Sequence, residues 1–456
     1  MSDDILVVCP QAVVPAWGLQ VETYHKKEPW KHQRDACEWV RGRRSAMLAL
    51  DMGTGKTLTA LMATCKPNSC VRTLLLGRGS TKSRADKLKK AMLIRPKGTG
   101  LIVVVNYDSV WRGELAKFIG GHKWKAIILD ESHRIKAPGG KASRWLASLA
   151  RANPQARLLC LTGTPMPHSP LDLYGQFRFL DPSVFGTSFA RMRARYADCD
   201  PMFPSKVRKW LRQDELAAIL NRNSFRVTAD EVLDLPEALH ERITVSLSPK
   251  ERKFYDSLES DMVAAIAGGH VVVSNALTKL LRLQQATGGH SVIEKEGGQA
   301  VVYLDGTPSK RQAFESWIED LAICEPVVVF CRFRSDINDV IAACKASGRT
   351  YSELSGERNQ LAEWQAGETD VIVVQIQSGG VGVDLTRAAY CVYYSLGFSL
   401  GDYEQSLARL RRPGQTRCVR YYHLVAEDTV DEEVYKALSQ RKDVVNAVLE
   451  KLSCRV

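Results

Sequence analysis

Residues 49–57, "ALDMGTGKT", decide how the rest of the sequence is interpreted. They join the apolar run AMLAL (46–50) to the helix-like segment LTALMA (58–63). A glycine-rich turn between a buried strand and a helix is the setting in which backbone N–H groups surround phosphate oxygens. The usual spacing, G-x-x-x-x-G-K-[ST], has glycine at the position of Leu50. The stretch therefore predicts a nucleotide site that departs from the common pattern, with a structural turn as the alternative.

Each position of this loop has an expected role. Gly53 and Gly55, on either side of Thr54, would leave the backbone open to the phosphates. Lys56 would pair with the β- and γ-phosphates, and the hydroxyl of Thr57 would bind Mg²⁺. A nucleoside triphosphate with Mg²⁺ is thus the expected ligand of the loop.

Short runs rich in Val, Ile and Leu recur along the chain and alternate with segments of helical pattern. The runs predict buried parallel strands at 5–9, 46–50, 101–105, 126–130, 157–161, 327–331 and 370–374. Segments such as 58–65, 83–94 and 141–151 predict helices between them. The alternation indicates an α/β fold with doubly wound parallel sheets flanked by helices, and its recurrence after a gap indicates two such lobes.

The middle of the chain differs from both ends. Residues 184–235 are Arg-rich with a helical pattern, and 249–285 predict one or two further helices. Glycine-containing stretches at 288–299 and 305–308 predict turns or a linker. We therefore expect a first lobe at 1–183, a helical insertion and inter-lobe linker at 184–305, and a second lobe at 306–456.

Composition restricts the class of protein. The 456 residues are 45% hydrophobic and 25% charged, and no apolar run reaches the ~20 residues of a membrane span. Asp3 and Asp4 stand where a secretory signal carries Lys or Arg. The 12 cysteines include no C-x-x-C pair, which argues against structural zinc and for a reducing compartment such as the cytoplasm.

The net charge of +12 suggests a polyanionic partner, with simple solubility as the alternative. The excess of Lys and Arg is spread over the segments expected to fold, with no basic tail. That distribution is typical of a basic groove rather than a basic arm.

Two acidic residues follow the strand KAIIL (125–129) directly. Asp130 and Glu131 would lie at the carboxyl end of a strand, where ligands bind in open α/β sheets. Asp130 would hold Mg²⁺, and Glu131 would orient and deprotonate the attacking water. The alternative is that the pair only caps the next helix.

Two arginines near the C-terminus have helical spacing. Arg409 and Arg412 are three residues apart, so both guanidinium groups can reach a single anionic target. Arginines supplied to a γ-phosphate stabilise charge in the transition state. A solvated basic helix is the alternative for these two residues taken alone.

Taken in order, these elements resemble the superfamily-two helicase-like ATPases, and among them the Swi/Snf family of double-stranded DNA translocases. The phosphate loop of that superfamily ends in G-x-G-K-T without the earlier glycine, as DMGTGKT (51–57) does. The other matching segments are WKHQRDACEW (30–39), VVVNYDSVW (103–111), DESHRIK (130–136), LTGTPMPHSPLDLYGQFRFLDP (161–182), DLPEALHERITVSLSPKERKFYDSL (234–258), LLRLQQATGGH (280–290), VVVFCRFRSDI (327–337), QIQSGGVGVDLTRA (375–388) and YEQSLARLRRPGQT (403–416). Together they cover nearly the whole chain and imply two RecA-like lobes, ATP and Mg²⁺ as cofactors, and double-stranded DNA as partner.

The resemblance also implies roles for single residues. Gln33 would contact adenine, and Gly382 and Asp384 would line the nucleotide cleft from the second lobe beside Arg409 and Arg412. Thr162 and Thr164 would couple the nucleotide state to the grip on DNA. The residues expected to lie toward the nucleic acid are Asn106, Tyr107, Thr162, Arg332, Ser378 and Gly379.

Three features depart from the family pattern. Position 411 is Arg where the family usually has His, and "SGGVGVD" (378–384) replaces a more usual arrangement with Arg or Ala after the serine. The segment "ILVVCPQAVVPAWGLQVETY" (5–24) resembles the strand and loop that normally follow the phosphate loop, yet here it precedes that loop. We expect residues 5–9 to fill the vacant strand position and Gln11 and Trp17 to lie near the DNA.

The sequence therefore predicts a DNA-stimulated ATPase that moves along duplex DNA and remodels DNA structures or DNA–protein complexes. It would act in the cytoplasm of a bacterial or phage-infected cell. Two alternatives remain open: a nucleic-acid-binding scaffold with weak ATPase activity, and the motor subunit of a restriction or defence assembly.

Overall fold

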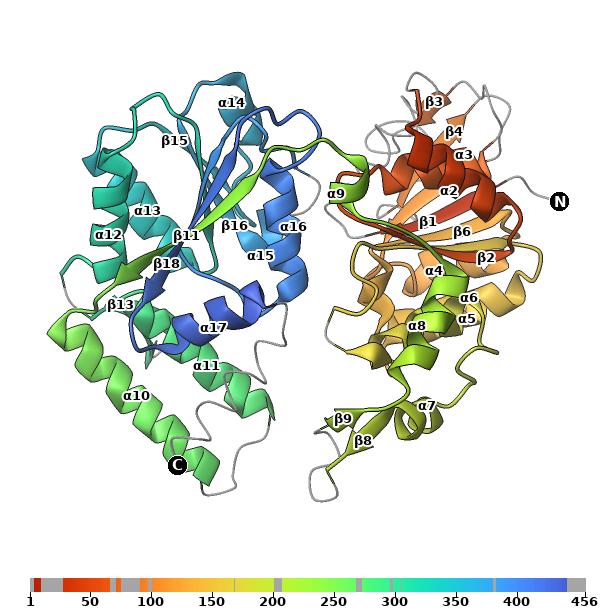
Figure 1. Ribbon diagram of the computed structural model, residues 1–456, viewed down its shortest axis with the longest axis horizontal. Coiled ribbons are helices and arrows are strands. Elements are labelled where there is room, and N and C mark those ends of the chain that lie inside the picture. Colours follow the sequence, from red (N-terminus) through yellow and green to blue (C-terminus); the bar gives the residue numbers. More distant parts are fainter. Residues whose placement is uncertain are drawn as a thin grey trace. The chain divides into compact units, whose positions relative to one another are not determined.

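The computed structural model falls into two compact units, Met1–Asp234 (unit 1) and Leu235–Val456 (unit 2). It describes residues 4–9, 28–65, 71–74, 91–96, 101–167, 169–200, 207–267, 273–295, 298–304, 306–379 and 383–440. Figure 1 shows that each unit has a twisted sheet with helices packed around it. The segment 184–305 is divided between the units, since its first part belongs to unit 1 and the rest to unit 2.

Unit 1 is built on a sheet whose described strands follow the order β10-β2-β7-β6-β1-β5-β4-β3. Their bounds are β1 (Ile5–Cys9), β2 (Ser45–Leu50), β3 (Val71–Leu74), β4 (Ala91–Pro96), β5 (Ile102–Asn106), β6 (Ala126–Asp130), β7 (Arg157–Leu161) and β10 (Ser224–Val227). Neighbours from β10 to β5 are parallel, whereas β4 and β3 pair antiparallel at the edge. The predicted parallel sheet is confirmed, with an antiparallel extension.

Strand β1 lies inside this sheet, between β5 and β6. Ile5 pairs with Ile102 on one side and with Ala126 on the other. All five residues are buried, and alternate side chains pack on opposite faces, Leu6 in one core cluster and Val7 in the other. The expectation that 5–9 forms a strand of the first lobe is confirmed, while Gln11 and Trp17 lie outside the described residues.

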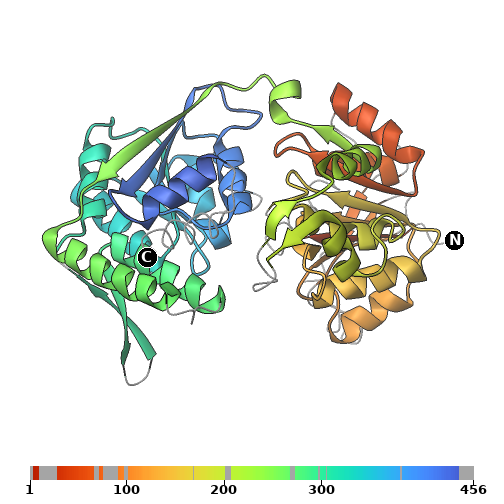
Figure 2. The same ribbon diagram turned by 60° about the horizontal axis from the view of Figure 1, so that its bottom comes forward.

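The helices of unit 1 cover both faces of its sheet (Figures 1 and 2). They are α2 (Lys31–Arg41), α3 (Lys56–Thr64), α4 (Gly113–Gly121), α5 (Lys141–Ala152), α6 (Leu173–Leu180), α7 (Phe189–Tyr196), α8 (Gln213–Asn223) and α9 (Ala229–Val232), with 3₁₀ turns at Ser132–Ile135 and Pro170–Asp172. Apolar residues of α2 and α3 pack on one face, and those of α4 to α8 pack on the other. A short hairpin, β8 (Ala197–Cys199) and β9 (Val207–Trp210), follows α7.

One local prediction in this unit is wrong, and a second is incomplete. The helix predicted at 83–94 conflicts with β4, which begins at Ala91 and pairs with β5; residues 83–90 lie outside the described part. Pairing with a strand that is already present outweighs the local helical pattern at 91–94. The Arg-rich segment 184–235 contains the expected helices but also β10, which extends the sheet beside β2.

Unit 2 has a second sheet, in which six described strands follow the order β11-β18-β17-β14-β16-β15 with every pair parallel. The strands are β11 (Ala238–Val245), β14 (Val327–Cys331), β15 (Tyr351–Leu354), β16 (Val371–Gln375), β17 (Tyr390–Tyr393) and β18 (Val419–Ala426). The helices are α10 (Pro249–Ala267), α11 (Val273–Thr287), α12 (Ser309–Glu319), α13 (Arg334–Ala346), α14 (Leu361–Ala366), α15 (Ile376–Gly379), α16 (Leu400–Leu410) and α17 (Val430–Ser439). Each face of the sheet again has its own core cluster.

The stretch 288–299, predicted as turns or linker, is instead part of a hairpin. Strands β12 (His290–Lys295) and β13 (Gly298–Tyr303) pair antiparallel, with His290 opposite Tyr303. Both segments contain β-branched residues that favour strands, and the flanking glycines hid this pattern.

Among the residues described, no helix is both long and apolar enough to cross a bilayer.

The interior position of β1 leads to a stability prediction. Leu6→Ala should destabilise unit 1 by about 2–5 kcal/mol, because Leu6 is fully buried and its truncation leaves a cavity in the core. Leu239→Ala, the same change at a side chain that is 41% exposed, is the matched control and should cost far less. Denaturant unfolding of both variants checks this; equal effects would contradict the central role of β1.

Candidate nucleotide site

The loop after β2 has the geometry of an anion-binding turn. Gly53 and Gly55 have φ values of 82° and 84°, in the left-handed region that favours glycine, and Gly55 is the N-cap of α3. Thr54 between them is buried, and its hydroxyl donates to the carbonyl of Asp51 at 2.6 Å. The loop therefore leads directly into the N-terminus of α3, where backbone N–H groups and the helix dipole favour the binding of phosphate.

The N-terminal turn of α2 packs directly onto this loop. Gln33 is buried, and its amide donates to the carbonyl of Thr54 at 3.1 Å while its oxygen accepts from the backbone N–H of Trp30 at 2.9 Å. His32 donates through Nε2 to the same Thr54 carbonyl at 2.8 Å. A Cβ at Gly55 would stand 2.0 Å from the Gln33 amide nitrogen. Gln33, predicted to contact adenine, thus lies against the phosphate loop.

Lys56 is held by the loop itself. Its Nζ donates to the carbonyl of Leu50 at 3.0 Å and lies 3.5 Å from that of Asp51. The loop after β7 comes close, since a Cβ at Gly163 would be 3.7 Å from Lys56 Nζ. The phosphate loop and the segment that contains Thr162 therefore meet around the lysine.

The two acids lie at the end of β6, in the same sheet. Asp130 and Glu131 are both buried, and the Asp130 carboxylate accepts from the backbone N–H of Glu131 at 3.0 Å. Glu131 has φ 52°, a left-handed backbone conformation that is uncommon for residues other than glycine. Among the residues described, its Oε2 has no hydrogen-bond partner. Strain and an unsatisfied buried oxygen both cost stability and are typical of functional positions.

His133 connects these acids to the loop after β7. Its Nδ1 lies 3.5 Å from Glu131 Oε2 and 3.3 Å from the hydroxyl of Thr162. Burial lowers the pKa of His133, the Glu131 carboxylate raises it, and nearby cations that include Lys56 lower it further. Thr162 is fully buried and accepts from the N–H of Thr164 at 3.1 Å. His133 has no role in the sequence prediction, although it stands only three residues after Asp130.

The donors present fit Mg²⁺ bound together with a nucleotide. Asp130 and Thr57 offer a carboxylate and a hydroxyl, the oxygen ligands that Mg²⁺ prefers. Within the described residues no group of three or more His, Cys, Asp or Glu could hold a metal ion. Phosphate oxygens and water would therefore complete the coordination, as is usual for Mg²⁺ at phosphate sites.

In unit 2, the arginine segment packs against the segment that follows residue 382. Arg409 is buried in the last turn of α16, and its carbonyl accepts from the N–H of Leu385 at 3.1 Å. Arg412 donates from its terminal nitrogen to the carbonyl of Val383 at 3.3 Å, and its Nε has no partner among the described residues. Asp384 is exposed, and its carboxylate accepts from the N–H and hydroxyl of Thr386. Gly382 lies outside the described residues.

Two residues that the sequence left without a role hold the ends of the connection between the units. Asp51 accepts from the N–H of Ala229 at 3.1 Å, and its own N–H donates to the carbonyl of Val227. Arg411 donates from Nε to the carbonyl of Pro236 at 2.8 Å. The arginine that departs from the family pattern thus fixes the start of unit 2, whereas Asp51 fixes the end of unit 1.

Several residues expected to lie toward the nucleic acid are buried. The side chain of Asn106 accepts from the N–H of Ser109 at 2.7 Å, and Tyr107 donates its hydroxyl to the carbonyl of Asp130 at 2.8 Å. Both are only 7% exposed. Ser378 and Gly379 form the end of the short helix α15. Contact of these residues with DNA stays a prediction.

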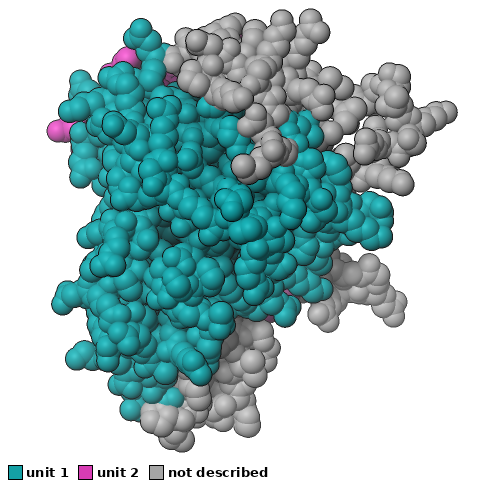
Figure 3. All heavy atoms as spheres, turned by 90° about the vertical axis from the view of Figure 1, so that its right-hand side faces the viewer, with its two compact units in different colours: residues 1–234 teal, residues 235–456 magenta. Residues whose placement is uncertain are grey.

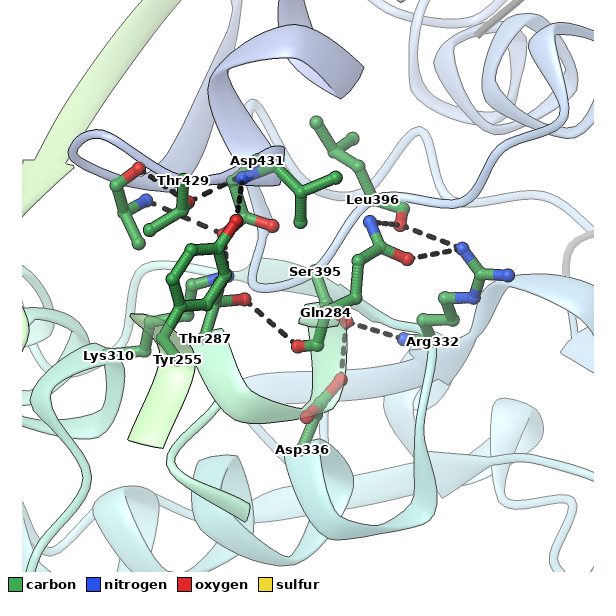
Figure 4. A network of polar contacts seen from close by, with 12 residues as sticks. Tyr255, Gln284, Thr287, Lys310, Arg332, Asp336, Ser395, Leu396, Thr429 and Asp431 are labelled. Carbon is green, nitrogen blue, oxygen red and sulfur yellow. Dashed lines mark hydrogen bonds and ion pairs between the residues drawn. The ribbon is translucent and has the colours of Figure 1, made fainter. Parts of the chain in front are cut away.

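Arg332 lies inside a polar network of unit 2 (Figure 4). Its guanidinium donates to Gln284 of α11 and stands 4.2 Å above the ring of Phe398. Its N–H donates to Ser395, whose hydroxyl donates to Asp336. Burial lowers the pKa of Arg332 to about 10. In this structure Arg332 joins α11 to the ends of two strands, a role that the sequence did not predict.

Two family models match the chain. The SNF2-related domain matches residues 75–291, and the helicase conserved C-terminal domain matches residues 309–414. The two matched ranges follow one another along the chain, one mainly in each half.

Two relatives and one solved structure align with most of this chain. A protein named p41 of Acyrthosiphon pisum secondary endosymbiont phage 1 is 25% identical, with 82% of this chain and 80% of that protein covered. An ATP-dependent helicase of Mycoplasma pneumoniae is 23% identical over 92% of this chain and 42% of its own length, so the chain spans less than half of that relative. The Sulfolobus solfataricus SWI2/SNF2 ATPase core in complex with dsDNA is 20% identical, with 91% of each chain covered and a TM-score of 0.38.

The left-handed loop leads to a binding prediction. Gly55→Ala should cost about 1–2 kcal/mol of local strain and push the new methyl group into Gln33, so the affinity for a fluorescent ATP analogue should fall at least tenfold. Gly120→Ala, in α4 with open space around its Cα, is the matched control and should leave affinity unchanged. Equal affinity of the Gly55 variant and wild type would contradict this picture of the loop.

Proposed function

We propose that the chain is a helicase-like ATPase of the SNF2-related family, whose domain models match residues 75–291 and 309–414, and that its ATP hydrolysis drives movement along double-stranded DNA. The observation that carries the proposal is the meeting of four groups at one edge of the first sheet. These groups are the left-handed glycine loop, Lys56, the acids Asp130 and Glu131, and the Thr162 segment. Such an edge, at the carboxyl ends of parallel strands, is where α/β proteins bind nucleotides.

Each residue of the site in unit 1 has a separate role in the proposed hydrolysis. Backbone N–H groups around Gly53 and Gly55 hold the phosphates, and Lys56 exchanges the carbonyl of Leu50 for phosphate oxygens when ATP binds. Asp130 and Thr57 would hold Mg²⁺, which when bound would offset charge on the phosphates. Glu131 orients the attacking water and accepts its proton, a role that suits a buried carboxylate with one free oxygen.

The arginines of unit 2 supply the remaining positive charge. Arg409 and Arg412 lie together with the Val383–Leu385 segment, and the unsatisfied Nε of Arg412 is available for an anion. We infer that they stabilise the charge that develops on the γ-phosphate. On this proposal hydrolysis requires residues from both units.

Two observations support DNA as the partner along which the chain moves. The chain carries a net charge of +12, and its motifs resemble those of a family that acts on duplex DNA. Contacts to backbone phosphates position a protein without reading the base sequence. We therefore expect binding that weakens steeply with salt and shows little sequence preference. Thr162 and Thr164 belong to the segment proposed to pass the nucleotide state to this contact, and Ser378 and Gly379 belong to a segment proposed to lie toward the DNA.

The first experiment measures steady-state ATPase activity with duplex DNA, single-stranded DNA and RNA. Duplex DNA should stimulate turnover most, and Lys56→Ala should lower kcat by a factor of about 10² or more while duplex binding persists. Lys117→Ala, an exposed lysine on α4, is the matched control and should behave like wild type. Stimulation by RNA alone would replace the proposal with an RNA helicase, and full biological activity of Lys56→Ala would replace it with a scaffold.

A further inference from the structure

The opposite edge of the first sheet carries a concentration of positive charge. A cavity of about 470 Å³ lies where β2, β6 and β7 begin. We call it the basic cavity, and its lining residues are Arg41, Gly42, Arg43, Arg44, Thr64, Lys125, Ala126, Pro154, Gln155 and Arg157. Five of these ten are cations and none is acidic. A five-residue strand spans roughly 17 Å, so this cavity and the nucleotide site are separate places on unit 1.

The backbone holds the cations of the basic cavity together, although they come from distant parts of the sequence. The N–H of Leu158 donates to the carbonyl of Arg44 at 2.8 Å, and the N–H of Arg157 donates to that of Lys125 at 2.9 Å. The guanidinium of Arg157 in turn donates to the carbonyls of Ala63 and Arg41. These contacts position the charges without neutralising them.

The helix C-termini around the basic cavity offset only part of its positive charge. Helices α2, α3 and α5 end at the cavity, and each C-terminus contributes roughly −0.5 of an elementary charge, about −1.5 together. Even with Lys125 left out, the four arginines leave an excess of more than two positive charges. Within the described part of the chain, Arg41, Arg43, Arg44 and Arg157 form no ion pair with an acid.

The cations also repel one another. Burial lowers the pKa of Arg157, and the positive charge of Arg41 lowers it further. Arg41, Arg43 and Arg44 are exposed at the rim, and Arg43 is fixed 4.0 Å above the ring of Trp39. An anion in the basic cavity would relieve this repulsion.

We propose that the basic cavity binds backbone phosphates of duplex DNA, as a contact separate from the nucleotide site. A free nucleotide fits less well, because the described lining has no aromatic side chain on which a base could stack. The exposed rim admits a large partner, and DNA presents one charge per roughly 1.7 Å of its axis to several cations at once. The assignment of DNA rests on the function proposed above.

The test compares two double variants with the same change of charge. Arg43→Gln with Arg44→Gln removes two rim cations, whereas Arg191→Gln with Arg222→Gln removes two exposed arginines on α7 and α8. Affinity for a labelled 30-base-pair duplex is measured by fluorescence anisotropy at several salt concentrations, without ATP. Loss of the rim pair should weaken binding roughly threefold to tenfold and reduce the slope of log Kd against log salt by about 1 to 2.

The control pair should change both quantities much less, and kcat at saturating DNA should stay at the wild-type value in the rim variant. An unchanged slope in the rim variant, or an equal loss in the control pair, would overturn the proposal. Calorimetric titration of inorganic tripolyphosphate, with the nucleotide site saturated by a non-hydrolysable ATP analogue, separates the two sources of phosphate. Loss of tripolyphosphate binding in the rim variant with the DNA slope intact would assign the basic cavity to a free phosphate compound instead.

Failure of the proposed motor function would be visible separately, because the binding assay contains no ATP. A wild-type chain that binds duplex DNA without stimulation of its ATPase activity would contradict the motor. The same chain could still lose affinity with the rim arginines, which would support the basic cavity.

Discussion

The register of β7 between β2 and β6 is the constraint on which the nucleotide site depends. Leu161, the last residue of β7, pairs with Leu48 on one side and with Asp130 on the other. Strands β6 and β7 therefore end at one level and β2 extends two residues further, so the segments that follow the three strands lie along one edge. The phosphate loop, the acids and the Thr162 segment meet there because hydrogen bonds of the sheet fix the strands, and β1 and β10 extend the sheet on either side.

The same edge concentrates features that lower stability. Glu131 is buried in a strained conformation with one unpaired oxygen, and Lys56 is bound to carbonyls that a phosphate would replace. Each feature costs free energy in the resting protein and becomes favourable when a ligand supplies its partner. The large apolar cores on both faces of the sheet offset this cost, since strands such as β1 are buried along their whole length. The opposite edge carries an excess of positive charge.

Much of this arrangement could be predicted from the sequence, because it depends on the types of residue within short segments. Runs such as VVVFC (327–331) are too apolar for anything but a buried strand, and GTGKT (53–57) fixes both the turn and the helix that follows. Features decided by distant contacts escaped prediction. Strand β4 exists because β5 offers it an edge, and Arg332 is buried because α11 covers it. The basic cavity was also invisible, since residues 41–44, 125 and 157 meet only through the order of the strands.

The replacement Glu131→Gln tests the central claim most directly, because it keeps the size of the side chain and removes its capacity to accept a proton. Single-turnover hydrolysis of ATP in the presence of duplex DNA should slow by a factor of about 10² to 10⁴. Affinity for ATP should persist, and the free energy of unfolding should be unchanged or higher, since the buried unpaired carboxylate is gone. Hydrolysis within a few-fold of wild type, or a clear loss of folding stability, would contradict the account of this edge as a site strained for catalysis.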